Sequence, residues 1–509
     1  MKSLFKTVAL ITLFSFLTRI SGFVFRIILS RVVGAEGLGI YQAALSIFLV
    51  LLTIISSGIP LIISRFTATF STKKEDNESS FITVSLIFTL ALSILLSLII
   101  FIFKNLFAGV FTNKDYINVL LILLPGLVFS SVYCVLRGSM WGKGNYFALC
   151  ITEFYEEIVR IFMALFLIDS TLSALQNAYN LGLSMSIACL FSMMLTILLY
   201  FYYGGKLGKL KKGYLKPLLK QSTPITFMRV IGSFIQPLIA FIIPLRLMKI
   251  GYTNLQAISL YGVAVGMTLP LLFVPTTIIG SLSTALLPDI TKAVAQNDKN
   301  HIEKRVSSSI FFALFISALF IPFFLGAGEQ TGIFLYNDVL SGSLLQSSAW
   351  VLLPLGLTNI SSGLLNSLGL EKKSFINFLI GSVVMIISIW FLPTIFGINA
   401  LLWGMGINYL TISLLNFWLL KRHTKVKLNL FKSLLKTILI VIPCGALTSF
   451  VTCLLALSLP LFFTLLIAGL ISVSSYILLC GVFDLIDIKT FVVKAKGKFK
   501  LPKVRTKKI

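Results

Sequence analysis

Two arginines within the first apolar segment are the residues of this sequence best placed to do chemistry. Arg19 and Arg26 lie seven positions apart, which is two turns of a helix, and Gly22 lies between them. One helix face therefore presents two guanidinium groups beside a position without a side chain. Charged side chains at membrane depth are costly and usually face a bundle interior or a water-filled cavity. We expect this face to bind an anion; the alternative is that each arginine extends to a lipid headgroup or pairs with a buried carboxylate.

A second charged helix face is predicted within residues 146–168. Glu153, Glu156, Glu157 and Arg160 have the spacing i, i+3, i+4 and i+7, so they share one face. Arg160 can reach Glu156 or Glu157 along its own helix and form a structural ion pair. The carboxylates left over are expected either to keep arginines of other helices charged and exchange with an arriving anion, or to bind a coupling proton or cation.

The composition is that of a membrane protein. Of the 509 residues, 57% are hydrophobic, and they form runs of about 20 residues without the period-two alternation of barrel strands. Only helices or closed barrels span a bilayer, because the lipid core cannot hydrogen-bond the backbone. We therefore predict an all-α polytopic membrane protein.

Charge and residue types exclude several other classes. The net charge of +26 lies mostly in short loops and at the C-terminus, which argues against a nucleic-acid-binding protein. The six cysteines are scattered through apolar segments without metal-ligand spacing, so we expect no disulfide, no metal and no other cofactor. The two histidines, His301 and His423, fall in predicted loops, and no Ser-His or Cys-His pair or phosphate loop occurs. We expect a protein that is not an enzyme.

The hydropathy of the sequence predicts about fourteen transmembrane helices, arranged as two sets of six and a C-terminal pair. Their predicted ranges are 4–33, 41–63, 81–103, 117–136, 146–168, 178–203, 222–247, 257–287, 306–326, 345–368, 374–396, 398–418, 437–457 and 461–480. The predicted domains are an N-terminal lobe (1–205), a basic cytoplasmic linker (206–221), a C-terminal lobe (222–420), the helix pair (437–480) and a polybasic cytoplasmic tail (481–509).

A short motif indicates that the two six-helix sets are related. Arg19-Ile-Ser-Gly22 recurs as Arg229-Val-Ile-Gly232 at the same place in the second set. A unit of six spans keeps its orientation when it is repeated, so the lobes are expected to be related by an axis along the membrane normal. Arg229 thereby becomes a third arginine of the expected anion site.

The distribution of basic residues predicts the orientation of the chain. With fourteen spans and a cytoplasmic N-terminus, most of the 43 lysines and arginines fall on the cytoplasmic side, and those on the opposite side are Arg31, Lys104, Lys114, Arg246 and Lys249. Such a bias indicates that both termini are cytoplasmic. We expect the polybasic tail to rest on anionic lipids of the bacterial plasma membrane, and we expect a monomer.

The segment from Thr18 to Tyr41 resembles the opening motif of a known family. Its pattern T-R-x-x-G-F-V-x-R-x-x-x-x-R-x-x-G-x-E-G-x-G-x-Y is similar to that of the stage V sporulation protein B group of polysaccharide-type transporters. This group belongs to the multidrug/oligosaccharidyl-lipid/polysaccharide (MOP) flippase superfamily, which also includes the MurJ-type lipid II flippases. Further similar motifs are Leu136-Arg137-Gly138 with Trp141-Gly142, Glu156-Glu157-Ile158-Val159-Arg160, Thr223-Pro224-Ile225-Thr226, Thr284-Ala285-Leu286-Leu287-Pro288 and Leu368-Gly369-Leu370-Glu371-Lys372-Lys373.

The resemblance implies a MOP/MATE-like fold of two six-helix lobes and a terminal helix pair. It implies a flippase that moves an undecaprenyl-pyrophosphate-linked peptidoglycan precursor, similar to lipid II, or a related glycan to the outer leaflet. Arg19, Arg26 and Arg229 would bind the pyrophosphate, with the glutamates of residues 146–168 as counter-charges, and the membrane potential, H⁺ or Na⁺ would drive transport. The sequence has Phe25 where the MurJ-type branch has a further arginine, so the sporulation-type branch is the closer match.

Two other functions stay open. A drug or cation antiporter of the same superfamily would use carboxylates without an excess of intramembrane arginine. A membrane glycosyltransferase or polymer ligase would also bind polyprenyl-pyrophosphate sugars. It would need an acid or base and usually a large loop on the outer face, and the predicted outer loops are short.

Overall fold

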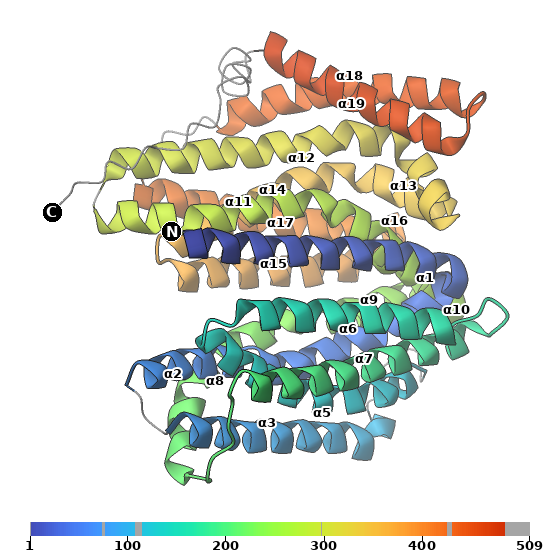
Figure 1. Ribbon diagram of the computed structural model, residues 1–509. Coiled ribbons are helices and arrows are strands. Elements are labelled where there is room, and N and C mark those ends of the chain that lie inside the picture. Colours follow the sequence, from blue (N-terminus) through green and yellow to red (C-terminus); the bar gives the residue numbers. More distant parts are fainter. Residues whose placement is uncertain (1, 74–76, 107–114, 297, 425–429, 484–509) are drawn as a thin grey trace. The chain divides into compact units, whose positions relative to one another are not determined.

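The chain is helical throughout the part that the structure describes. The computed structural model describes residues 2–73, 77–106, 115–296, 298–424 and 430–483, and no β-strand occurs among them (Figure 1). The first group of helices is α1 (Lys2–Ser56), α2 (Ile59–Lys73), α3 (Asn77–Ile102), α5 (Asp115–Gly142), α6 (Tyr146–Leu167), α7 (Ala174–Tyr202) and the 3₁₀ turn η1 (Lys212–Tyr214). The second group is α8 (Leu215–Ser233), α9 (Ile235–Lys249), α10 (Asn254–Gly262), the π-helical η2 (Val263–Thr268), α11 (Leu269–Ala295), α12 (Lys299–Tyr336), α13 (Val339–Ser348), the 3₁₀ turn η3 (Ala349–Val351), α14 (Leu352–Ser367), α15 (Glu371–Phe391), α16 (Pro393–Phe396), α17 (Asn399–Thr424), α18 (Leu430–Ala456) and α19 (Leu461–Val482).

These helices confirm the predicted all-α membrane architecture. Twelve helices in the described ranges are long and apolar enough to cross a bilayer. α6 is not among the twelve because four charged residues lie within it, although its bounds match the fifth predicted span. The range 10–70 counts once, although α1 bends at Gly34 between the first and second predicted spans. With these two additions, the described helices correspond to the fourteen predicted spans.

The first two predicted spans, 4–33 and 41–63, are joined by a bend in a continuous helix. Only Gly34 leaves the helical conformation, with φ 73° and ψ 176°. Glycine adopts a positive φ without steric cost, so this one residue redirects the chain. The other glycines of the segment serve close packing: a Cβ atom on Gly39 would lie 2.3 Å from the carbonyl oxygen of Ile258 on α10. Residues 34–40 are therefore a turn at Gly34 followed directly by helix.

Several later spans are interrupted helices. The seventh predicted span consists of α8 and α9, which are separated at Phe234. The eighth contains η2 between α10 and α11, and the tenth contains η3 between α13 and α14. Helix breaks at membrane depth persist only where neighbouring groups or water satisfy the freed backbone groups.

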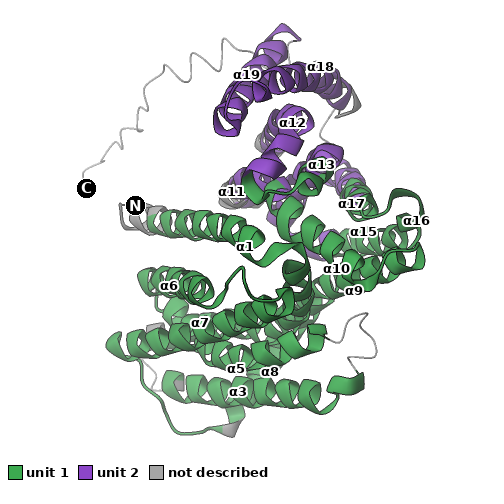
Figure 2. Cartoon of the chain, turned by 90° about the vertical axis from the view of Figure 1, so that its right-hand side faces the viewer, with its two compact units in different colours: residues 1–271, 335–344, 375–411 green, residues 272–334, 345–374, 412–509 purple. Residues whose placement is uncertain are grey.

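The helices pack into two compact units, which Figure 2 colours separately. Unit 1 comprises residues 1–271, 335–344 and 375–411, and unit 2 comprises residues 272–334, 345–374 and 412–509. These units are groups of mutually packed helices, and their boundaries differ from the predicted lobes. The division of the chain into lobes at 206–221 therefore stays a prediction.

Small residues let the helices of unit 1 approach closely. α5 packs against α2, α3 and α7 (Figure 1). Cβ atoms on Gly138 and Gly142 of α5 would lie 2.8 Å and 2.5 Å from the carbonyl oxygens of Pro60 and Ser64 on α2, respectively. Close backbone contact through small residues is the usual means by which helices associate in membranes.

Unit 2 has its own buried core. Asn416 of α17 donates hydrogen bonds from Nδ2 to Ser361 Oγ at 3.1 Å and to Ser362 Oγ at 3.0 Å, which joins α17 to α14. α18 and α19 pack against each other. The apolar core is formed by residues of α11, α12, α14 and α17, including Ile279, Val306, Ile310, Leu314, Ile360, Leu364 and Leu420.

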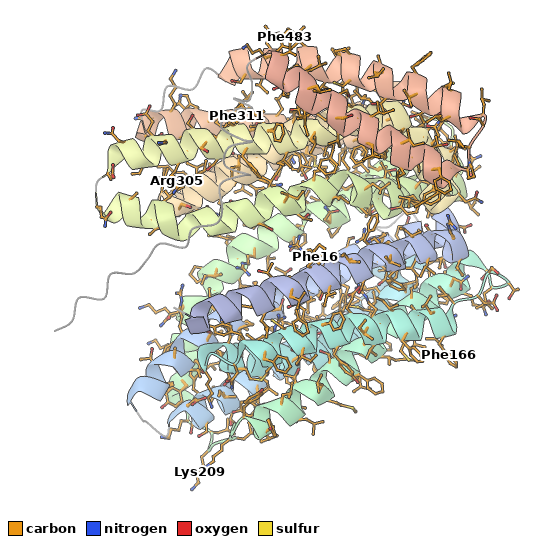
Figure 3. All side chains as sticks on the ribbon, turned by 45° about the horizontal axis from the view of Figure 1, so that its top comes forward. Phe16, Phe166, Lys209, Arg305, Phe311 and Phe483 are labelled. Atoms are coloured by element: carbon orange, nitrogen blue, oxygen red, sulfur yellow. The ribbon has the colours of Figure 1, made fainter. Side chains whose placement is uncertain are left out.

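The predicted basic linker is fixed to unit 1. The backbone N–H of Gly208 donates to Thr83 Oγ1 at 3.0 Å, and Tyr200 Oη donates to the carbonyl oxygen of Lys206 at 2.9 Å. Lys209 is exposed and its side chain points away from the helices (Figure 3). The predicted polybasic tail, by contrast, lies almost entirely outside the described residues, as does Lys114.

Candidate functional site

The two arginines of the first apolar segment lie on the first half of α1. Residues 10–33 are helical because they form an apolar run without a helix breaker before Gly34. The side chains of Arg19 and Arg26 are both exposed, which means that other parts of the protein leave them uncovered. Within the described ranges, neither side chain has a hydrogen bond or an ion pair. Both guanidinium groups are therefore available to a ligand.

Arg160 of α6 forms an ion pair with Glu157, which is one of the two partners that the sequence predicts for it. The pair lies against α1. The Arg160 guanidinium carbon is 5.8 Å from the centre of the Phe25 ring, and a Cβ atom on Gly22 would lie 3.1 Å from Glu157 Oε1. Gly22 thus leaves room for a carboxylate of the facing helix, which is the physical reason for glycine at this position.

Arg26 lies in the electrostatic environment of this pair. It interacts with Arg160, with Glu157 and with the hydroxyl groups of Tyr41 and Tyr336. Tyr336 is the last residue of α12 and is 2% exposed. Glu157 thus interacts with both guanidinium groups, and Arg160 interacts with Glu156 as well.

Three buried polar atoms of this cluster have no hydrogen-bond partner among the described residues. They are Glu157 Oε1, Arg160 Nε and Tyr336 Oη. Buried polar groups are nearly always paired, and each that is not needs an explanation, such as a ligand or an ion. The cluster is thus able to receive a further polar group.

The other two glutamates of α6 contact different helices. Glu153 forms an ion pair with Arg137 of α5, and Arg137 also lies 5.5 Å from the centre of the Tyr133 ring. Glu156 accepts a hydrogen bond from Ser192 Oγ of α7 at 3.3 Å. Of the three glutamates, Glu157 is the one that lies against α1, at Gly22. The role of these carboxylates as counter-charges for Arg19 and Arg26 stays a prediction.

Arg229 lies on α8. Its side chain is exposed, and it has no ion pair or hydrogen bond in the part of the chain that the structure describes. α8 packs against α1, and a Cβ atom on Gly58, which lies between α1 and α2, would be 2.5 Å from the carbonyl oxygen of Ser222. A Cβ atom on Gly232 would lie 3.4 Å from the Phe378 ring instead of a carboxylate. The two Arg-x-x-Gly motifs therefore share spacing but differ in what faces their glycines.

Tyr336 and Arg137 are the two residues of this region that sequence reasoning missed. Tyr336 lies far along the chain and carries no charge, so no spacing rule relates it to Arg26. Arg137 follows the last residue of a predicted span, which placed it in a loop, whereas α5 extends to Gly142.

Comparisons with known proteins agree with this fold. The family model described as "Polysaccharide biosynthesis protein" matches residues 4–289. Stage V sporulation protein B of Bacillus subtilis (strain 168) is 26% identical over 385 residues, which are 72% of this chain and 73% of that protein. The inward closed conformation of the lipid II flippase MurJ superposes with a TM-score of 0.72 at 16% identity, and the match covers 95% of this chain and 100% of that chain.

An inward-facing multidrug resistance MATE family transporter of the MOP superfamily gives a TM-score of 0.67 at 16% identity, over 80% of this chain and 94% of that chain. At these identities the solved structures show a shared fold, that of multi-pass membrane transporters. The family model covers more than half of the 509 residues. The chain therefore belongs to the polysaccharide biosynthesis protein family.

Proposed function

We propose that this protein is a flippase that moves a pyrophosphate-linked glycan lipid from the inner to the outer leaflet of a bacterial plasma membrane by alternating access. The observation that carries the proposal is the positive charge on α1, where the exposed Arg26 has no ion pair among the described residues and the nearby Glu157 is paired with Arg160. Arg19 lies two turns away on the same helix and is also uncovered. The names of two similar proteins, a sporulation protein and a lipid II flippase, support a precursor of peptidoglycan or a related glycan as the substrate.

Arginine suits a pyrophosphate for two physical reasons. Its planar guanidinium group donates to two phosphate oxygens at once, and it stays charged at membrane depth. Outward movement of an anion is favoured by an inside-negative potential by about 2.3 kcal/mol per charge per 100 mV. The membrane potential can thus supply part of the driving force for transport. An H⁺ or Na⁺ gradient is the alternative source of driving force.

The arrangement of the carboxylates disfavours a drug or cation antiporter. A cation site needs carboxylate oxygens that are free of other cations. Two of the three glutamates of α6 are held by Arg137 and Arg160, and the third accepts a hydrogen bond from Ser192. No group of three or more His, Cys, Asp or Glu residues suited to a metal ion occurs among the described residues.

Replacement of the uncovered arginines by lysine tests the proposal. Lysine keeps the charge and the reach of arginine, but it cannot form bidentate hydrogen bonds to a phosphate group. We expect Arg19→Lys, Arg26→Lys and Arg229→Lys to accumulate in the membrane at wild-type levels while rescue of a flippase-depleted bacterial strain falls sharply.

Arg246→Lys is the matched control. Arg246 lies in the last turn of α9, 5.2 Å from the centre of the Trp390 ring, and is not part of the proposed site. This variant should rescue growth like the wild type. Full rescue by all three site variants, or loss of all three from the membrane, would show that these arginines do not bind a pyrophosphate.

A further inference from the structure

Glu157 is the one carboxylate that lies between the charged faces of α6 and α1. Its side chain is buried, with 8% of the residue exposed, and its Oε2 atom pairs with Arg160. Its Oε1 atom lies against α1 at Gly22 and has no hydrogen-bond partner within the described ranges. Only one of its two oxygens is therefore used by the protein itself.

Two guanidinium groups and a second carboxylate surround Glu157. Arg160 approaches from α6 and Arg26 from α1, and both interact with Glu157. The other ionisable groups in range are neutral tyrosines, Tyr41 and Tyr336, together with Glu156, whose carboxylate is turned to Ser192 of α7. Glu157 forms its ion pair with Arg160, Arg26 has no ion pair within the described ranges, and Arg160 keeps an unpartnered Nε–H.

We propose that Glu157 is a resident counter-anion that occupies Arg160 while the transporter is empty and is displaced from it by the phosphate group of a substrate. This inference rests on the proposed function and assigns the anion-binding role to Arg160 as well as to the arginines of α1. Carboxylate and phosphate both accept two parallel hydrogen bonds from a guanidinium group, so they compete for the same partner.

The exchange gives the transporter a way to bind an anion and still release it. An empty site with two unpaired guanidinium groups is unfavourable because like charges repel at short range. Glu157 relieves this repulsion in the empty state, and its return to Arg160 favours release of the substrate. A side chain in place of Gly22 would bring its Cβ atom to 3.1 Å from Oε1, so the carboxylate would have to shift by a few tenths of an ångström.

Binding of inorganic pyrophosphate to the purified full-length protein tests the inference. In Glu157→Gln the side-chain amide oxygen can still accept a hydrogen bond from Arg160, but the competing charge is gone. Removal of one charge at this range is expected to tighten pyrophosphate binding about tenfold in a calorimetric titration at low salt. The same variant should flip a lipid-linked substrate more slowly in proteoliposomes at saturation, because release is slowed.

Glu78→Gln is the matched control. Glu78 of α3 pairs with Lys143 at 2.8 Å, so this variant makes the same change of charge at an ion pair outside the site. Its pyrophosphate affinity should equal that of the wild type. Thermal melting of each variant shows whether it is folded. If Glu157→Gln is unstable, Glu157→Asp is measured instead. The shorter aspartate side chain holds Arg160 less firmly, so this variant protein should also bind pyrophosphate more tightly than the wild type.

The outcomes separate this inference from the function on which it rests. If the wild type binds pyrophosphate but a folded Glu157 variant binds it no more tightly, the inference that Glu157 is a resident counter-anion is wrong. The proposed flippase function would not be affected by that result. If neither the wild type nor any folded variant binds pyrophosphate, the anion site and with it the proposed function are wrong.

Discussion

The crossing of α1 and α10 offers a sharp test of the packing in unit 1. A Cβ atom on Gly262 would lie 1.9 Å from the carbonyl oxygen of Ala35 and 2.8 Å from the backbone nitrogen of Gly39. Gly39 in turn faces the carbonyl oxygen of Ile258. Both contacts are between backbone atoms, so no side chain is able to move aside. We therefore expect Gly262→Ala to be strongly destabilising.

The magnitude follows from the distance. An ordinary van der Waals contact for a Cβ atom begins at 3.4 Å, so the two helices must separate by roughly 1.5 Å to accommodate the methyl group. Overpacking of this kind costs about 1–3 kcal/mol, and occasionally more. Because backbone meets backbone, we expect a loss of about 3 kcal/mol. In the purified protein this should appear as a fall of several degrees in the apparent melting temperature.

Gly280→Ala is the control for this prediction. Gly280 lies within α11, and no atom lies within 4 Å of the place where its Cβ atom would be. Alanine is favoured over glycine in a helix by about 0.5–1 kcal/mol, so this variant should melt at or above the wild-type temperature. Equal melting temperatures for Gly262→Ala and the wild type would refute the close crossing.

Two further predictions concern the site and the orientation. Tyr336→Phe removes a buried hydroxyl group that has no hydrogen-bond partner among the described residues. The free energy of unfolding should stay unchanged or rise by up to about 1 kcal/mol, while the affinity for pyrophosphate falls. A clear loss of stability would show that the hydroxyl group is hydrogen-bonded in the empty protein. Cysteines introduced for Thr171 and Lys209 flank α7, and in intact cells a membrane-impermeant maleimide should label the first and not the second, because the basic linker is predicted to be cytoplasmic. If only Lys209→Cys were labelled, the orientation of the chain in the membrane would be opposite to the predicted one.

Hydropathy was sufficient to predict the spans but not the connection between the first two. Three glycines in the segment Gly34–Gly39 indicate a loop by their type alone. Only Gly34 has the positive φ of a turn, whereas Gly37 and Gly39 lie where the carbonyl oxygens of Ala174 and Ile258 approach. Glycine at a turn and glycine at a helix crossing look the same in a sequence, because the second depends on a residue far along the chain.

The candidate site was predicted in part for a similar reason. The spacing of Glu157 and Arg160 determines their ion pair, because residues three apart meet on one helix face. The partner of Glu153 could not be predicted in this way, since Arg137 belongs to another helix and lies beyond the apolar part of its predicted span. Tyr336 was missed because an uncharged tyrosine at a helix end carries no signal of its own.

The three glutamates of α6 show why a count of charges does not by itself locate a site. They share one broad helix face, yet Glu153 faces α5, Glu156 faces α7 and Glu157 faces α1. Because α6 packs against three neighbouring helices, different parts of this face contact different neighbours. Each carboxylate therefore interacts with the helix that it contacts. The carboxylates that the sequence leaves as a surplus are thereby used in packing. Arg19 and Arg26 of α1 have no ion pair among the described residues, which is why we assign an anion to this position.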